Sequence, residues 1–288
     1  MKIIYTGVFC LLAGFFSAQS TQFVYEYKFK PDSLNRETII AENMVLEIKA
    51  EGSRFVSQKK ILSDSILSAN VQKMKQGGGN HIDMTSVQQP KVRNQVLKKY
   101  PSYDTTFKTM PGSIPLAVSI SKKPEWKIST EKSEVLGYKV QKATTKFMGR
   151  EWAAWFASEI PFQDGPDTFQ GLPGLIVKVE DSKNHHSFVL IGTKKVSNSE
   201  ENANQNKFTR QEIPLNEEKF KKYWQDYKKD PVKDMRQTIT STSGAVVTSM
   251  TFNGKTYSQE EIIRDSEKHR KEQLKTNNNF INLELYKP

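Results

Sequence analysis

The sequence is poor in the residue types from which most catalytic and metal centres are built. Its 288 residues include one cysteine, Cys10, and four histidines. A single thiol excludes an internal disulfide and a cysteine-ligated zinc site. Two of the histidines, His185 and His186, are adjacent, and neighbouring residues of a strand face opposite ways, so they chelate one ion poorly. We therefore expect no metal site and no cofactor.

Long hydrophobic runs are also scarce. The run from Ile3 to Phe16 follows Lys2 and is too short to span a bilayer. With Ser17-Ala18-Gln19 after it, this run predicts a signal peptide over residues 1–19, and an uncleaved anchor is the alternative. No lipobox surrounds Cys10. We expect secretion across the inner membrane to the periplasm or cell exterior, with no transmembrane segment in the mature chain.

Positive charge exceeds negative charge, with 43 Lys and Arg against 32 Asp and Glu and a formal net charge of +11. Such a surplus of positive charge favours binding to anionic surfaces such as lipopolysaccharide or acidic glycan. The alternative is a set of dispersed lysines without a common target. No nucleic-acid-reading motif occurs, so we do not expect a nucleic-acid partner.

Short strand patterns dominate the first two-thirds of the chain. Residues 23–29 alternate apolar and polar side chains, and a hairpin is predicted around Glu51-Gly52. The even spacing of these short strands along the chain predicts a mainly β (α+β) protein with a curved antiparallel sheet rather than a βαβ layout. Further strands are predicted at residues 114–120, 126–128, 138–143, 151–156, 175–179 and 187–191.

Helical patterns are fewer. Residues 61–74 show a loose apolar face, and the Asn-rich segment 197–210 predicts a loop. Asn216 caps a helix that ends before Asp230-Pro231, and Ser258 with Glu261 forms a capping box for a surface helix. We expect one domain over residues 20–288, with a helical region from about 216 to 288.

An aromatic stripe occupies one face of the helix that Asn216 caps. The stripe predicts core packing, and a platform for a ligand or partner is the alternative. Its residues are Phe220, Tyr223, Trp224 and Tyr227.

The strand after Arg150 carries bulky aromatic residues on both faces. The strand period puts Trp152 and Phe156 on one face and Trp155 on the other. A sheet with one solvated face would not show this pattern, so helices cover both faces or one face lines a cleft.

The hexapeptide Gly171-Leu172-Pro173-Gly174-Leu175-Ile176 predicts an architectural corner. Pro173 fixes φ and Gly174 supplies a positive φ, as a type II turn requires, and a buried strand follows. A phosphate-binding loop is excluded because the Lys-Ser/Thr pair and the following helix are missing.

The segment from Gly137 to Ile176 resembles the GLPGLI family. The resemblance is carried by residues 137–139, 141–143, 149–150, 154–156, 159–161, 165–166 and 169, together with the hexapeptide. It implies a secreted bacterial envelope protein without assigned activity. It also implies a sheet curled into a half-barrel or bowl, similar to the N-terminal domain of a secreted peptide:N-glycanase. The glycanase activity is not implied.

Two departures from the family pattern concern the same segment. Asp167 and Thr168 stand where the family commonly has an aromatic residue and a lysine, so the resemblance assigns that loop no binding role. Val140 stands where the family often has a cysteine.

No catalytic constellation stands out. A Ser-His-Asp triad has no supporting motif. A calcium site would need oxygen ligands at closer spacing than Glu159, Asp164 and Asp167 offer. No pattern supports a pair of glycosidase carboxylates.

The first functional hypothesis is therefore a non-enzymatic bowl that binds an amphipathic ligand or an envelope protein. The candidate concave-face residues are Arg150, Trp152, Trp155 and Phe156, with Arg150 as an anion contact. The alternatives are a hydrolase acting on glycan or peptide, indicated by Arg150 beside two carboxylates, and a structural accessory of an outer-membrane transporter.

Overall fold

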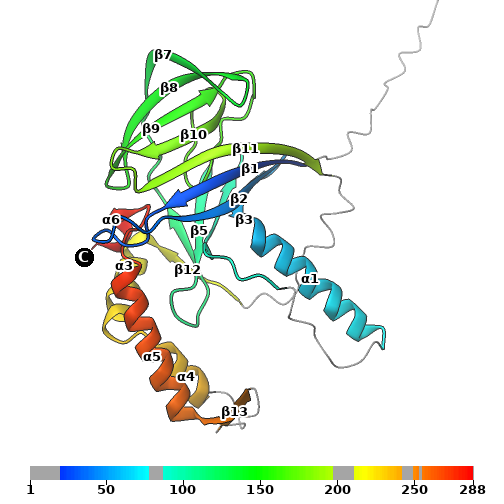
Figure 1. Cartoon of the computed structure of the whole chain (residues 1–288), viewed down its shortest axis with the longest axis vertical. Coiled ribbons are helices and arrows are strands. Elements are labelled where there is room, and N and C mark those ends of the chain that lie inside the picture. The colour runs from blue at the N-terminus through cyan, green and yellow to red at the C-terminus, as the bar shows by residue number, and fades with distance from the viewer. Residues whose placement is uncertain (1–19, 78–86, 197–210, 242–248, 253–254, 288) are drawn as a thin grey trace, which may run out of the picture.

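An open sheet of twelve strands forms the body of the protein (Figure 1). The computed structural model describes residues 20–77, 87–196, 211–241, 249–252 and 255–287. The predicted signal peptide, its Cys10 and the predicted loop at 197–210 lie outside the described residues. Among those described, no helix combines the length and the apolar character that crossing a membrane would need.

The sheet consists of two antiparallel meanders that meet at the pairing of β1 with β11. The first meander contains β1 (Ser20–Phe29), β2 (Ile40–Lys49), β3 (Gly52–Ser57), β4 (Gln95–Lys99), β5 (Asp104–Thr109) and β6 (Leu116–Ile120). The second contains β7 (Lys127–Val135), β8 (Tyr138–Phe147), β9 (Arg150–Ala157), β10 (Leu175–Asp181) and β11 (His186–Val196). The short strand β12 (Ile213–Asn216) joins β6 in parallel, so the sheet is mixed.

Strand alternation gives the sheet one buried face. In β1, Phe23, Tyr25 and Tyr27 are buried while the residues between them are partly or fully exposed. Register shifts interrupt the β1–β11, β9–β10 and β7–β8 pairings, and such bulges bend strands. The mainly β fold and the curved sheet are thus confirmed.

The helices are α1 (Gln58–Lys75), α3 (Glu217–Lys229), α4 (Lys233–Ser241), α5 (Gln259–Thr276) and α6 (Leu283–Tyr286). In Figure 1, α4 and α5 lie below β12, α6 and α3 lie beside the sheet at the same end, and α1 projects from the other side. Asn216 caps α3 and the Ser258–Glu261 capping box begins α5, as the sequence predicts. A two-stranded hairpin of β13 (Ser249–Phe252) and β14 (Lys255–Ser258) precedes α5.

The sequence prediction was wrong in several places. β4, β5, β12, the β13–β14 hairpin and α4 were not predicted, and α1 begins three residues before Ile61. The strands β4 and β5 were missed because they are rich in polar residues, including an inward-facing Lys98 that is 2% exposed.

A loop between β9 and β10, residues 158–174, covers part of the concave side of the sheet. Asp164 in this loop forms an ion pair with Lys98 at 2.5 Å, and neither side chain is exposed. Ser53 and Tyr100 donate further hydrogen bonds to Asp164, while Lys98 also donates to the carbonyls of Gly165 and Phe169. The loop is therefore fixed to β3 and β4 through a buried, fully hydrogen-bonded pair.

The hexapeptide ends this loop in a tighter turn than expected. The amide of Gly174 donates to the Leu172 carbonyl at 2.8 Å, and the amide of Leu175 donates to Ile160. The turn is thus a three-residue γ-turn around Pro173, and the expected type II turn is not formed. Gly174 keeps a positive φ of +147°, and a Cβ there would lie 2.3 Å from the Ala157 carbonyl oxygen.

We predict that three glycine-to-alanine substitutions differ in their cost to stability. Gly174→Ala combines strain with a backbone clash and should cost about 2–4 kcal/mol. Gly171→Ala has a φ of +90° but free space around it, so it should cost about 1–2 kcal/mol. Gly192→Ala is the control because its Cβ would meet nothing within 4 Å and its φ is not positive. Urea unfolding measures all three, and equal losses at 171 and 174 would contradict the clash.

We also predict that removal of the Lys98 charge is severely destabilising. Lys98→Met leaves Asp164 buried without its cation, at an expected cost of about 3–5 kcal/mol of unfolding free energy. Lys60→Met is the matched control, since Lys60 pairs with Asp64 on the surface of α1 and such pairs contribute about 0.5 kcal/mol. Similar losses in both variants would refute the role of the buried pair.

Candidate functional site

Arg150 holds the C-terminal segment rather than facing an open surface. Its guanidinium donates to Asp181 at 3.1 Å and to the Asn279 side chain and the Phe280 carbonyl, both at 2.6 Å. The pair with Asp181 is almost completely buried. Among the described residues, Arg150 therefore pairs with one carboxylate, that of Asp181, and not with the two that would favour a hydrolase.

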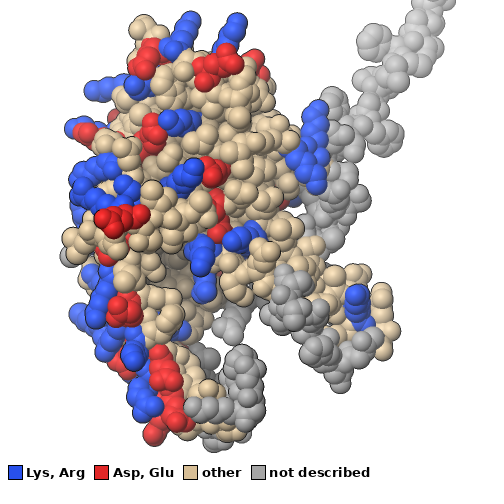
Figure 2. Space-filling view, in the orientation of Figure 1, with Lys and Arg blue, Asp and Glu red and all other residues tan. Residues whose placement is uncertain are grey.

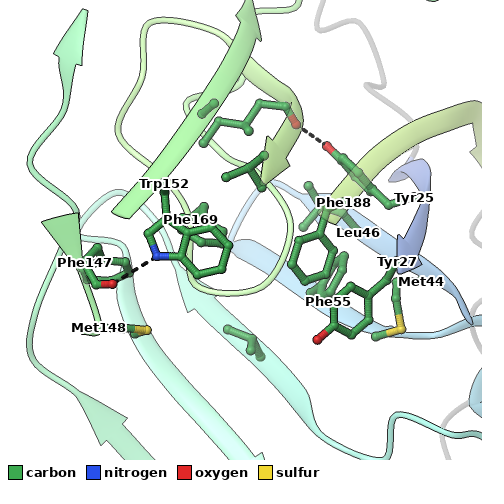
Figure 3. Close-up of a cluster of buried hydrophobic side chains, with 14 of the residues drawn as sticks. Tyr25, Tyr27, Met44, Leu46, Phe55, Phe147, Met148, Trp152, Phe169 and Phe188 are labelled. Atoms are coloured by element: carbon green, nitrogen blue, oxygen red, sulfur yellow. Dashed lines mark hydrogen bonds between the residues drawn. The ribbon is translucent and has the colours of Figure 1, made fainter. Parts of the chain in front are cut away.

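Trp152 and Phe156 lie in the hydrophobic core. Trp152 is 2% exposed, donates its Nε1 hydrogen bond to the Phe147 carbonyl and packs edge-on against Phe169 at a centroid distance of 4.7 Å (Figure 3). Phe169 belongs to the loop 158–174, which thus occupies the concave space that the sequence left open to a ligand. On this face of β9, the loop covers the sheet where we expected helices or a cleft.

Trp155 lies on the opposite face and is half-buried. Lys142 on β8 places its Nζ 5.5 Å from the Trp155 ring centroid, a cation–π contact. None of the four candidate residues lines either of the two cavities described below. Ligand binding through these four residues stays a prediction.

A cavity of about 620 Å³ separates the concave side of the first meander from the C-terminal segment. Tyr27, Phe55 and Phe188 lie together on its sheet side, and Tyr27 stacks on Phe188 at 4.1 Å (Figure 3). Trp224 and Tyr286 line the opposite side. Ligand sites are commonly of this size and lined by apolar and aromatic groups, which makes this cavity the candidate site.

The chain's own C-terminal segment forms one wall of this cavity. Phe280 and Tyr286 stack at 3.8 Å, and Trp224 of α3 meets both rings edge-on. Asn279 anchors the segment by accepting from Arg150 and donating to the Lys30 carbonyl. The wall is therefore a folded part of the domain, held at both the sheet and α3.

His186 and Tyr27 form a polar pair at the floor of the cavity. The Tyr27 hydroxyl lies 2.8 Å from His186 Nδ1, while His186 Nε2 has no hydrogen-bond partner among the described residues. Burial, reinforced by the positive charge of Arg150, holds the pKa of His186 well below its usual value. The ring is thus neutral at pH 7 and available as a hydrogen-bonding group.

A carboxylate, Asp167, also lines the cavity. Many protein atoms surround it, although part of its surface stays accessible from the cavity, and this burial raises its pKa. Lys91, Arg93 and Arg270 are the cationic residues among the lining. Within the described part of the chain, no group of three or more His, Cys, Asp or Glu side chains is arranged to hold a metal ion.

A second cavity, of about 690 Å³, lies on the other face of the sheet beside α1. Three of its polar side chains are bound to one another, since Arg54 pairs with Glu47 at 2.6 Å and Gln22 donates to the same residue. Lys and Arg are interleaved with Asp and Glu over the face shown in Figure 2, as dispersed lysines would be. We therefore place the candidate site in the 620 Å³ cavity.

Sequence reasoning missed the main residues of this site. Tyr27, Asp167 and His186 are far apart in sequence, and only the fold brings them to one cavity. Two signals were present: Asp167 departs from the pattern of the resembled family, and Trp224 belongs to the aromatic stripe of α3. The structure confirms the predicted core packing of this stripe, since Phe220, Trp224 and Tyr227 are buried. Trp224 also lines the candidate cavity, and a role of the stripe as a ligand platform stays a prediction.

Comparison with known proteins gives a family of unknown function. Residues 149–178 match a family described as "Protein of unknown function (Porph_ging)". The match includes Gly171–Ile176, so a related family without assigned function is supported, and the GLPGLI name stays a prediction. No curated protein matches the chain.

Two solved structures of PNGF-II resemble the chain weakly. The structure in the P21 space group shares 14% identity over 71% of this chain, with a TM-score of 0.45. The structure in the C2 space group shares 13% identity over 69% of this chain, with a TM-score of 0.44. The aligned region spans about a third of the PNGF-II chains, at 33% and 31% of their length.

We predict that Trp152 and Trp155 differ in their access to acrylamide. A variant that keeps only Trp152 should resist quenching because the loop 158–174 covers its ring. A variant that keeps only Trp155 should be quenched several-fold more strongly, since that side chain is half-buried at the outer face. Stern–Volmer slopes measure this difference, and strong quenching of Trp152 would show that the concave side is open.

Proposed function

We propose that this protein binds a small amphipathic ligand in the 620 Å³ cavity and acts as a binding protein rather than an enzyme. The observation that supports this proposal is the lining: aromatic side chains from two sides, with His186 and Asp167 among them. Apolar pockets with a few convergent polar groups and perturbed pKa values are typical of ligand sites.

The proposal includes a location in the bacterial envelope. The signal-like segment at residues 1–19 supports export to the periplasm or beyond. On the face shown in Figure 2, positive and negative side chains are mixed, so that face offers no patch of positive charge for an anionic surface. A role as accessory of an outer-membrane transporter receives little support from exposed apolar residues, since those described, such as Leu34, Ile128 and Ile213, lie on separate elements.

The test is saturable binding of N-phenyl-1-naphthylamine, a neutral apolar dye whose emission rises in apolar sites. Leu274→Trp on α5 adds bulk to the wall of the 620 Å³ cavity and should weaken binding about tenfold or more. Leu62→Trp on α1 is the matched control because Leu62 lines the other cavity. Thermal melts verify that both variants fold.

Two outcomes would contradict the proposal. Absence of saturable dye binding to the wild-type protein would argue against a ligand cavity. Weakened binding in Leu62→Trp with unchanged binding in Leu274→Trp would move the site to the cavity beside α1.

A further inference from the structure

Asp167 has a left-handed backbone conformation in the loop 158–174. Its φ is +50°, in a region that aspartate and asparagine adopt more readily than most other residues with a side chain. Asp167 and its neighbour Thr168 both line the cavity.

One oxygen of the Asp167 carboxylate has a partner in the protein and the other does not. Oδ1 accepts hydrogen bonds from the Thr168 amide at 2.9 Å and the Thr168 hydroxyl at 3.1 Å. Among the described residues, Oδ2 has no hydrogen bond and no ion pair. Asp167 is only partly exposed, so Oδ2 is open to the cavity and a ligand donor can pair with it.

Aromatic side chains line the same cavity as this carboxylate. Burial chiefly, and the negative charge of Asp167 in addition, raise the pKa of Tyr27 and of Tyr286, so Asp167 acts on both hydroxyls. Tyr286 in turn stacks with Phe280 and meets Trp224 at 5.0 Å. Aromatic faces attract cations, so a carboxylate among such rings favours a positively charged nitrogen.

We infer that the ligand of the 620 Å³ cavity carries a protonated amine that pairs with Asp167 Oδ2, with its apolar part between the aromatic walls. This inference rests on the proposed function and specifies the class of ligand. The amine would replace the missing partner of the carboxylate, and its hydrocarbon part would displace water from Tyr27, Phe188 and Trp224.

The cationic residues that line the cavity would favour an anionic ligand instead. Lys91 and Arg93 are exposed at the cavity, whereas Arg270 is occupied by the Pro231 carbonyl at 2.6 Å and the Ser113 hydroxyl at 3.2 Å. An exposed cation is well hydrated and contributes little to binding, whereas Asp167 is only partly exposed and therefore keeps less of its water. The less exposed group therefore decides the preference, and an anionic amphiphile is the competing outcome.

Three probes of equal chain length test the inference: octylamine, 1-octanol and octanoate, each displacing the naphthylamine dye. Octylamine should bind on the order of tenfold more tightly than octanoate. Asp167→Asn should remove that preference while leaving 1-octanol binding unchanged, because asparagine tolerates the left-handed backbone and can keep a Thr168 hydrogen bond. Asp104→Asn, at the other cavity, is the matched control and should change nothing.

The outcomes separate the two proposals. Displacement by 1-octanol without an amine preference, or an Asp167→Asn protein with unchanged octylamine affinity, would overturn the inference and leave the cavity as a ligand site. Tighter binding of octanoate that Arg93→Gln weakens would also overturn it and assign an anionic ligand. Failure of every probe to displace the dye, together with dye binding that Leu274→Trp does not affect, would overturn both.

Discussion

The attachment of the C-terminal segment to the sheet through Arg150 determines whether the candidate site exists. The guanidinium reaches Asp181 on β10 and Asn279 and Phe280 on the C-terminal segment, so one side chain joins regions distant in sequence. Its planar set of donors satisfies several acceptors at once, which a lysine at this position could not do. Without this attachment, the aromatic wall around Tyr286 would lose its support, and the cavity would become an open side of the sheet.

A second buried cation, Lys98, attaches the loop 158–174 to the concave side of the sheet. Lys98 points from β4 into the interior, where the loop 158–174 supplies Asp164 and two carbonyl oxygens. The two charges stabilise a loop with few regular backbone pairs and place Asp167 at the edge of the cavity. The sheet is therefore a support on which two segments without strands, the loop 158–174 and the C-terminal segment, define the space between them.

The sequence predicts well those features that depend on neighbouring residues. Alternation in β1 and the caps of α3 and α5 are local patterns, and each was identified correctly. The strand β4 was missed because Lys98 faces inward, against the expectation that lysine faces water. Arg150 was expected just before the strand 151–156 and is the first residue of β9. Its partners Asn279 and Phe280, however, lie more than a hundred residues away in the C-terminal segment, and no local pattern indicates them. The site was missed for the same reason.

The order of strands has a kinetic consequence. Within each meander, paired strands follow one another in sequence, although α1 lies between β3 and β4 and the loop 158–174 lies between β9 and β10. Each meander can therefore form as soon as its own residues are available. The strand β1, however, lies between β2 and β11, with Ser20 opposite Val196. Pairings between residues so distant in sequence slow folding, because the entropy of closing a long loop must be lost before they form. The two meanders can therefore pair only after β11 has formed. Until then, the edge of β1 that will pair with β11 is open to other chains.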